Sequence, residues 1–197
     1  MNKTQFAVTL MAVLMIASVA RAESDFDIVV NAMPATVLID IDGDKFSATG
    51  SDGRISLSEL YTMPNIAVGI GTELEDLYVD LVGGAGIIIN DGFRSFILQA
   101  ILELTFEASD SLNIGPRIGL IHFEDPEWLE NDDVEFDAET GLLVGVSMAM
   151  GDKIKYLVSV DIIDATFDLN TGAGVTTSES ELDLTGLAIQ FGVRGEF

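Results

Sequence analysis

Residues 187–197 read LAIQFGVRGEF, and apolar residues alternate with polar or small ones along the whole stretch. Successive side chains of a β-strand point to opposite sides, so this pattern predicts a strand with one apolar face. The apolar face carries Leu187, Ile189, Phe191, Val193, Gly195 and Phe197. The other face carries Ala188, Gln190, Gly192, Arg194 and Glu196.

Residues 1–22 have a basic start at Lys3, an apolar run over about residues 6–17, and the small-residue ending Ala20-Arg21-Ala22. This arrangement is typical of a secretory signal peptide. The apolar run is shorter than the roughly 20 residues that a membrane-spanning helix needs. We therefore expect export of the protein with removal of residues 1–22.

The composition of the 197 residues excludes several function classes. The formal net charge is −24 with 33 acidic residues, which argues against a nucleic-acid partner because such proteins need a basic patch. The chain has no Cys and one His, so thiol chemistry is excluded and imidazole chemistry is limited to one site. A hydrophobic content of 48% indicates a packed protein rather than a disordered one.

The alternation seen at residues 187–197 recurs along the chain, bounded by turn residues. It predicts strands over residues 35–48, 63–74, 77–90, 93–108, 112–123, 140–150, 154–168 and 183–197. Short connections alternate with long ones, except at Asp91-Gly92, which is typical of a two-residue type I′ hairpin. The predicted fold class is all-β, with an even number of antiparallel strands.

An export signal followed by alternating strands, the last ending on Phe197, resembles small bacterial outer-membrane β-barrels, the class of the OmpA membrane domain and OmpX. The resemblance implies an eight-stranded antiparallel up-and-down transmembrane barrel in the outer membrane. It also implies that the barrel-assembly machinery reads the final strand, through Phe191, Val193 and Phe197. Gly195 departs from the family pattern, which usually has a bulky residue at that position.

Alternation does not by itself say which face points inward, and a soluble lipocalin-like barrel shows the same period. The apolar face carries about five large residues on each strand, which matches the roughly 25 Å band of a membrane barrel. The other face is rich in Gly and Ala, as the narrow lumen of eight strands requires. We therefore expect residues 23–34 to be a periplasmic lead-in, and residues 35–197 to form one monomeric barrel surrounded by lipid and lipopolysaccharide.

Hairpin arithmetic predicts one charged cluster in the lumen. Pairing across the 91–92 and 109–111 turns places Asp80 opposite Glu103, and Glu103 opposite Arg117. The cluster is interpreted as a structural ion-pair network, with a gate or a catalytic carboxylate pair as the alternative. Further lumen charges are expected at Asp40, Lys155, Asp161 and Arg194.

Two features lie at the expected outer rim. His122 resembles the rim His of lipid A deacylases, but these carry Ser two places later, where this chain has Glu124, so His122 is interpreted as an interfacial residue. The loop over residues 124–139 is densely acidic and could attract Ca²⁺. Its weak candidate ligands are Glu124, Asp125, Glu127, Asp132 and Asp133. No other cofactor is expected.

Fold does not fix function. The favoured hypothesis is a non-enzymatic envelope protein that stabilises the outer membrane or presents acidic loops for surface contact. A narrow pore, or a path for small hydrophobic molecules, is the alternative. A lipid A-modifying enzyme is a weaker alternative, and we expect no enzymatic activity.

Overall fold

The structure is a computed structural model of the 197-residue chain. It describes residues 26–41, 46–50, 53–56, 58–74, 77–90, 92–128, 134–172 and 174–197. The expected signal peptide, residues 1–22, lies outside these ranges. No helix among the described residues is long and apolar enough to cross a membrane.

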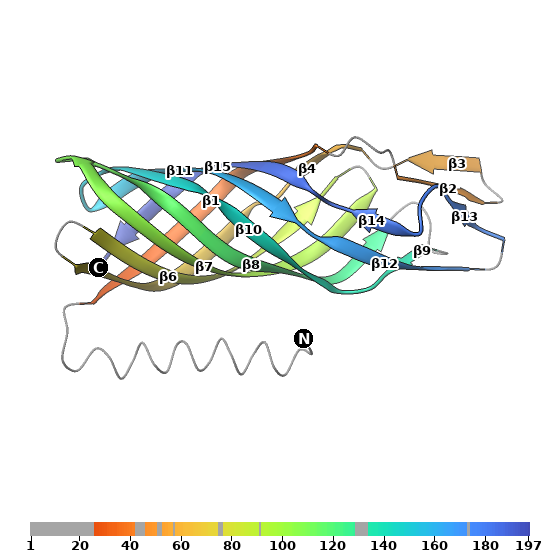
Figure 1. The fold of residues 1–197 in the computed structure, drawn as a ribbon, viewed down its shortest axis with the longest axis horizontal. Coiled ribbons are helices and arrows are strands. Elements are labelled where there is room, and N and C mark those ends of the chain that lie inside the picture. The colour runs from red at the N-terminus through yellow and green to blue at the C-terminus, as the bar shows by residue number, and fades with distance from the viewer. Residues whose placement is uncertain are drawn as a thin grey trace.

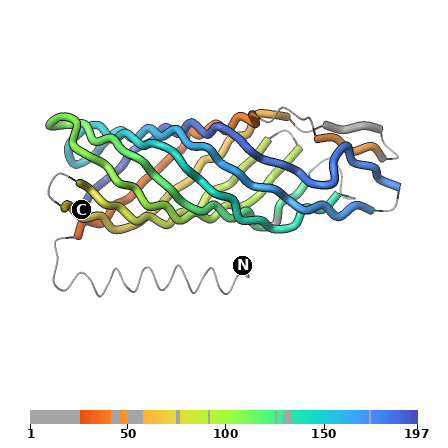
Figure 2. The backbone as a smooth tube through the Cα atoms, viewed as in Figure 1, coloured from red at the N-terminus to blue at the C-terminus, as the bar shows by residue number. Residues whose placement is uncertain are grey.

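In the part of the chain that the structure describes, eight long strands close into an antiparallel barrel (Figure 1). Each strand pairs with the next along the chain, and β15 pairs back to β1, which closes the wall. The strands are β1 (Asp27–Asp40), β5 (Asn65–Leu74), β6 (Leu77–Ile89), β7 (Phe93–Ser109), β8 (Leu112–Trp128), β10 (Glu139–Gly151), β11 (Ile154–Asp164) and β15 (Gly186–Glu196). Figure 2 shows them coiling obliquely about the long axis, as closure of a barrel requires.

The two ends of the barrel differ. The short connections β5–β6, β7–β8 and β10–β11 lie at the end where β1 begins and β15 finishes (Figure 1). Outer-membrane barrels place short turns on the periplasmic side and longer loops outside. The opposite end, which we call the long-loop end, is therefore the outer one.

Short strands extend the wall at the long-loop end. They are β2 (Ser47–Gly50), β3 (Gly53–Ser56), β4 (Leu60–Thr62), β9 (Val134–Phe136), β12 (Thr166–Thr171), β13 (Thr176–Thr177) and β14 (Glu181–Asp183). Strand β4 pairs with β1 and β6, and β12 pairs with both β9 and β14. Strands β13, β2 and β3 form a separate small sheet.

The first strand begins earlier than the sequence pattern predicts. Strand β1 runs over Asp27–Asp40, so most of the expected lead-in at residues 23–34 belongs to the barrel wall, and residues 47–50 belong to β2. Pro34 interrupts the apparent pattern, because proline has no N–H to give to a ladder. The strand tolerates it at a register shift between Ala32 and Ala35.

The fifth strand of the wall, β8, also exceeds its predicted range of 112–123 and continues to Trp128. Its pairing with β7 shifts between Arg94 and Phe96, and the extra residues on β8 include Pro126. The predicted strand over 154–168 is divided between β11 and β12, which are separated by Ala165. A search for strict two-residue alternation does not detect bulges and breaks of this kind.

The apolar face of the wall points outward. Ile66, Leu120 and Tyr156 are 64%, 52% and 70% exposed, whereas Arg117 and Arg194 are 4% and 2% exposed inside the barrel. A water-soluble barrel would have the opposite arrangement, since large exposed apolar surfaces are unfavourable in water. The expected orientation is confirmed, and lipid rather than water is the solvent that suits this wall.

The interior has two layers. Toward the periplasmic end it is filled by charged and amide side chains, described below. Toward the long-loop end it is an apolar core, in which Tyr61 contacts Phe93 edge to face with ring centroids 5.9 Å apart. Phe123 and Phe167 pack in the same way at 5.1 Å. This aromatic layer closes the barrel above the charged one.

Candidate functional site

Sheet register brings the charged side chains of the lumen together. Asp80 on β6 lies opposite Glu103 on β7, and Glu103 lies opposite Arg117 on β8. The next strand, β10, contributes Gly145, which faces both Arg117 and Asp161. A Cβ at Gly145 would lie 2.2 Å from Asp161 Oδ1, so only glycine leaves room for this carboxylate to approach Arg117.

Two arginines hold three carboxylates. Arg117 donates from Nη1 to Glu103 Oε1 at 3.1 Å, and its Nε lies 3.0 Å from Asp161 Oδ1. Arg194 on β15 donates to Asp80 Oδ2 at 2.8 Å and to the second oxygen of Glu103. Glu103 therefore bridges both guanidinium groups while its residue is 0% exposed.

Neutral side chains extend this lumen network around the barrel. Gln190 donates to Asp161 Oδ2 at 2.9 Å and accepts from Asn65 at 3.2 Å. Gln99 donates to Asn65 Oδ1 at 2.9 Å. Arg194 Nε donates to Asn31 Oδ1, also at 2.9 Å. Hydrogen bonds thus link β1, β5, β6, β7, β8, β11 and β15 across the lumen.

The arrangement of the lumen network favours a structural role over a catalytic one. Its charges nearly balance, and buried charges are tolerated only when they are paired and hydrogen-bonded. The internal cavity beside it, lined in part by Gln99, Glu103 and Arg117, has a volume of about 10 Å³. That is room for about one water molecule. A solute cannot pass while these side chains keep their positions.

Two other expected lumen charges lie apart from this network. Lys155 sits opposite Arg194 in the register, but its Nζ binds Glu196 at 2.7 Å and lies 5.6 Å from the centre of the Tyr78 ring. Asp40 is at the far end of β1. There, burial first and the Asp40 charge second raise the pKa of Tyr61 above its usual range. Strand β1 starts earlier than expected and places Asp40 at the long-loop end, away from this network, so a place for Asp40 among the lumen charges stays a prediction.

The expected assembly residues lie on the outward face of β15 and at its end. Phe191, Val193 and Phe197 are 52%, 42% and 76% exposed. This placement leaves their role in assembly a prediction.

The candidate calcium ligands are not gathered into one site within the described ranges. Asp132 and Asp133 lie outside them, as does the side chain of Asp125. Glu127 forms an exposed ion pair with Arg94, and Glu124 lies beside His122. No group of three or more His or acidic side chains able to hold a metal occurs in the described part of the chain. Calcium binding by this loop stays a prediction.

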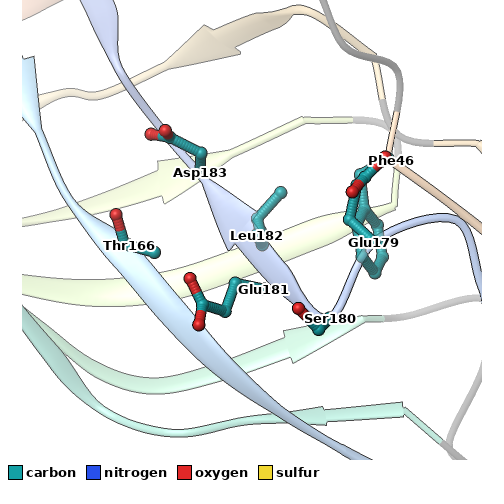
Figure 3. A pocket seen from close by; sticks show the side chains of 7 residues that line it. All are labelled: Phe46, Thr166, Glu179, Ser180, Glu181, Leu182 and Asp183. Atoms are coloured by element: carbon teal, nitrogen blue, oxygen red, sulfur yellow. The ribbon is translucent and has the colours of Figure 1, made fainter.

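An acidic hollow that sequence analysis missed lies beside the paired strands β12 and β14 (Figure 3). Its volume is about 260 Å³. The lining residues are Phe46, Thr166, Glu179, Ser180, Glu181, Leu182 and Asp183. These carboxylates sit in the predicted connection over residues 169–182 and just after it, so only their acidic character could have been noticed from sequence.

His122 lies on the outward face of β8 at the rim, and polar groups lie beside both of its ring nitrogens. Its Nδ1 is 2.9 Å from Thr140 Oγ1 on β10, and its Nε2 is 3.4 Å from Glu124 Oε2. Sequence analysis missed Thr140, because it considered only residues that follow His122 along the same strand. The pairing of β8 with β10 places Thr140 directly opposite His122.

No protein-family model and no curated protein sequence matches the chain. Among solved structures, the chain is similar to the outer membrane protein OprG from Pseudomonas aeruginosa, with 13% sequence identity and a TM-score of 0.51. The match covers 87% of this chain and 95% of OprG. With the closed wall and the apolar outer band, this likeness decides the fold. The chain has the fold of a small outer-membrane β-barrel.

Two further structures are similar to this barrel at lower scores. Neisserial surface protein A matches with 15% identity and a TM-score of 0.42, over 88% of this chain and 98% of that one. OmpT from Vibrio cholerae matches with 12% identity and a TM-score of 0.35, over 87% of this chain and 52% of that one.

Proposed function

We propose that the barrel is a closed envelope protein, which stabilises the outer membrane and presents an acidic surface outside it. The observation that carries this proposal is the filled interior. Paired charges occupy one layer of the lumen and packed aromatic rings occupy the next. Eight strands leave a lumen that side chains can just fill, so bulk solute passage is not expected.

The outer surface supports the second part of the proposal. Exposed carboxylates at the long-loop end include Glu59, Glu135, Asp137, Asp164, Asp168, Glu179, Glu181 and Asp183. Arg94, an exposed base in this region, is already paired with Glu127. We expect this surface to meet the anionic headgroups of lipopolysaccharide through divalent cations and to repel anionic partners. In this proposal the barrel is a monomer that reaches the membrane through the barrel-assembly machinery.

Reconstitution into planar bilayers tests the closed lumen. The purified barrel should leave the conductance at the level of protein-free bilayers, at both low and high salt. A heated and an unheated sample on a gel should migrate differently, which establishes that the reconstituted protein is folded. A steady conductance from folded protein would overturn the proposal.

A second candidate function, a lateral path for small hydrophobic molecules, rests on one observation. The outer wall carries an apolar groove of about 530 Å³. Its lining residues are Ala32, Met33, Pro34, Pro64, Asn65, Ile66, Ala85, Gly86, Ile87 and Phe96. Met33 and Asn65 line both this groove and the small internal cavity. Two of the lining residues are prolines, which cannot donate a hydrogen bond to the ladder.

Transfer of a hydrophobic fluorophore between vesicle populations tests the lateral path. Wild-type barrel should speed transfer relative to empty vesicles. Ala85→Trp should remove the increase by filling the groove, because Ala85 lines it on the outward face, opposite the exposed Ile66. Val144→Trp, which adds the same ring to the lipid face away from the groove, is the matched control. Equal transfer with and without protein would exclude this second candidate.

The expectation that the protein is not an enzyme stays a prediction. The proposed role assigns no chemistry to the lumen. Enzymatic activity at the outer rim is tested separately, by mass spectrometry of membrane lipids.

A further inference from the structure

On β8 and β10, the outward-facing side chains change from apolar to polar at the level of His122. Leu120, one outward position earlier on β8, is 52% exposed, and Leu142 on β10 is 44% exposed. The next outward positions toward the long-loop end are His122 and Glu124 on β8 and Thr140 on β10. On β8 and β10 this row is therefore where the apolar band gives way to polar side chains, while the facing positions on β7, Leu98 and Phe96, are still apolar. We take this boundary as the depth where hydrocarbon meets headgroups.

At this depth His122 is held between a hydroxyl and a carboxylate. The residue is 5% exposed, although it lies on the outward face. Thr140 Oγ1 lies 2.9 Å from Nδ1, and Glu124 Oε2 lies 3.4 Å from Nε2. With the imidazole proton on Nε2, that nitrogen faces the Glu124 carboxylate and Nδ1 accepts from the Thr140 hydroxyl.

The order hydroxyl, imidazole, carboxylate is the arrangement that activates a nucleophile. A neutral imidazole can take the hydroxyl proton, and the carboxylate fixes the ring and stabilises the imidazolium that forms. Such groups are identified by their geometry and roles, not by sequence order. Here β8 supplies the base and the carboxylate, and the neighbouring strand supplies the hydroxyl.

We propose that Thr140, His122 and Glu124, which we call the rim triad, hydrolyse acyl esters of outer-leaflet lipids. The ester bonds of a membrane lipid lie where its hydrocarbon meets its headgroup, which is the depth of this row. The exposed Leu120 and Leu142 beside the triad contact the acyl chains. This activity goes beyond the envelope role proposed above and contradicts the expectation that the protein is not an enzyme.

The reaction proceeds in two balanced steps. Thr140 Oγ1 bonds to the acyl carbon while its proton passes to His122 Nδ1, and the lipid alcohol leaves with that proton. Water then bonds to the acyl carbon and gives a proton to His122. The fatty acid leaves as Thr140 regains its proton, so one ester and one water become one alcohol and one fatty acid.

The test uses the folded full-length barrel in two kinds of vesicle. One contains phosphatidylethanolamine and phosphatidylglycerol, and the other contains purified lipopolysaccharide. Mass spectrometry measures the released fatty acids and the remaining lipids. Release from the first vesicles assigns glycerophospholipid esters as substrate, and release from the second assigns lipopolysaccharide esters.

Variants separate catalysis from folding. Thr140→Ala and His122→Gln should each lower the rate about 100-fold or more, the contribution typical of a nucleophile and its general base. Thr140→Ser should retain activity, since it keeps the hydroxyl. Thr185→Ala is the matched control, because Thr185 is a rim threonine bonded to Asp183 and Asp164 and not to an imidazole.

Glu124 is a positioning residue in this scheme. Glu124→Gln should lower kcat and leave KM unchanged, which loss of lipid binding would not do. Heat-dependent gel migration establishes that each variant is folded. The proposal is overturned if folded wild-type barrel releases no fatty acid from either vesicle, or if Thr140→Ala releases it at the wild-type rate.

Discussion

Glu103 shows how one residue links the parts of the lumen. Its two oxygens face different guanidinium groups, Arg117 from the neighbouring strand and Arg194 from β15. Removing one partner of a buried ion pair lowers the free energy of unfolding much more than replacing both partners with apolar residues does, because the remaining charge is left uncompensated. Glu103 is therefore the residue on which the stability of the lumen network depends most.

We expect Glu103→Ala to lower the free energy of unfolding by about 3–5 kcal/mol, since two buried arginines lose a shared partner. Urea titration in detergent, followed by heat-dependent gel migration, measures this change. The control is Glu107→Ala on the same strand, where the side chain is exposed and the change should stay within about 0.5 kcal/mol. Equal effects of the two substitutions would contradict a structural role for the network.

The buried phenol of Tyr61 predicts that the stability of the folded barrel depends on pH. Burial and the Asp40 charge raise the pKa of its phenol, so the folded barrel keeps Tyr61 neutral at pH values where the unfolded chain ionises. The unfolded pKa of tyrosine is about 10. The stabilisation from neutral Tyr61 is present in full below that pH and is lost as the pH rises above it.

Unfolding free energies measured between pH 8 and pH 11 test this prediction. Wild type should lose stability more steeply above about pH 10 than Tyr61→Phe, which has no phenol to ionise. Parallel curves for wild type and Tyr61→Phe would show that Tyr61 does not contribute.

At the scale of elements, the strands explain why the two faces of the wall were predictable. In β10 the outward residues Leu142, Val144 and Val146 alternate with inward or small ones, and side-chain direction in a strand depends only on sequence parity. Parity fails at Pro34 and Pro126, where the strand gains residues that its partner lacks. The outward face of the strands and the ends of β5, β6, β7 and β10 were therefore predicted closely, whereas the start of β1 and the end of β8 were not.

Strand β10 also carries a packing prediction. Gly145→Val should lower the free energy of unfolding by about 1–3 kcal/mol or more and reduce the folded fraction, because overpacking displaces neighbours. A Cβ there would meet Asp161 Oδ1 at 2.2 Å and the Val160 carbonyl oxygen at 2.3 Å. Ser147→Ala on the same strand removes a buried hydroxyl that has no hydrogen-bond partner among the described atoms, and it should be nearly neutral. Refolding yield on unheated gels gives the comparison.

At the scale of the whole molecule, two layers of side chains block the lumen. We expect each layer to keep its packing when a substitution disrupts the other. The lumen network closes the periplasmic half of the barrel, and the aromatic core around Phe93 and Phe167 closes the outer half. A change in one layer leaves the other in place. The barrel should therefore lose stability before it gains conductance.

Arg194→Ala tests this relation. We expect it to lower the free energy of unfolding by about 3–5 kcal/mol, since Asp80 and Glu103 lose their guanidinium. Its bilayer conductance should remain at the protein-free level, because the aromatic core still fills the outer half. Conductance that rises on this single substitution would mean that the charged layer alone acts as the gate.

The amino-acid sequence by itself determined the strand period, the lipid-facing residues and the outer-membrane class, because alternation and an export signal are local properties of the chain. It also indicated Asp80, Glu103 and Arg117, since short hairpins make register a matter of counting. Arg194 was expected in the lumen, but only the tertiary structure decided that it binds both Asp80 and Glu103, and that Thr140 lies against His122. These contacts depend on closure between distant strands and on proline bulges, and neither has a period that can be read along a single strand.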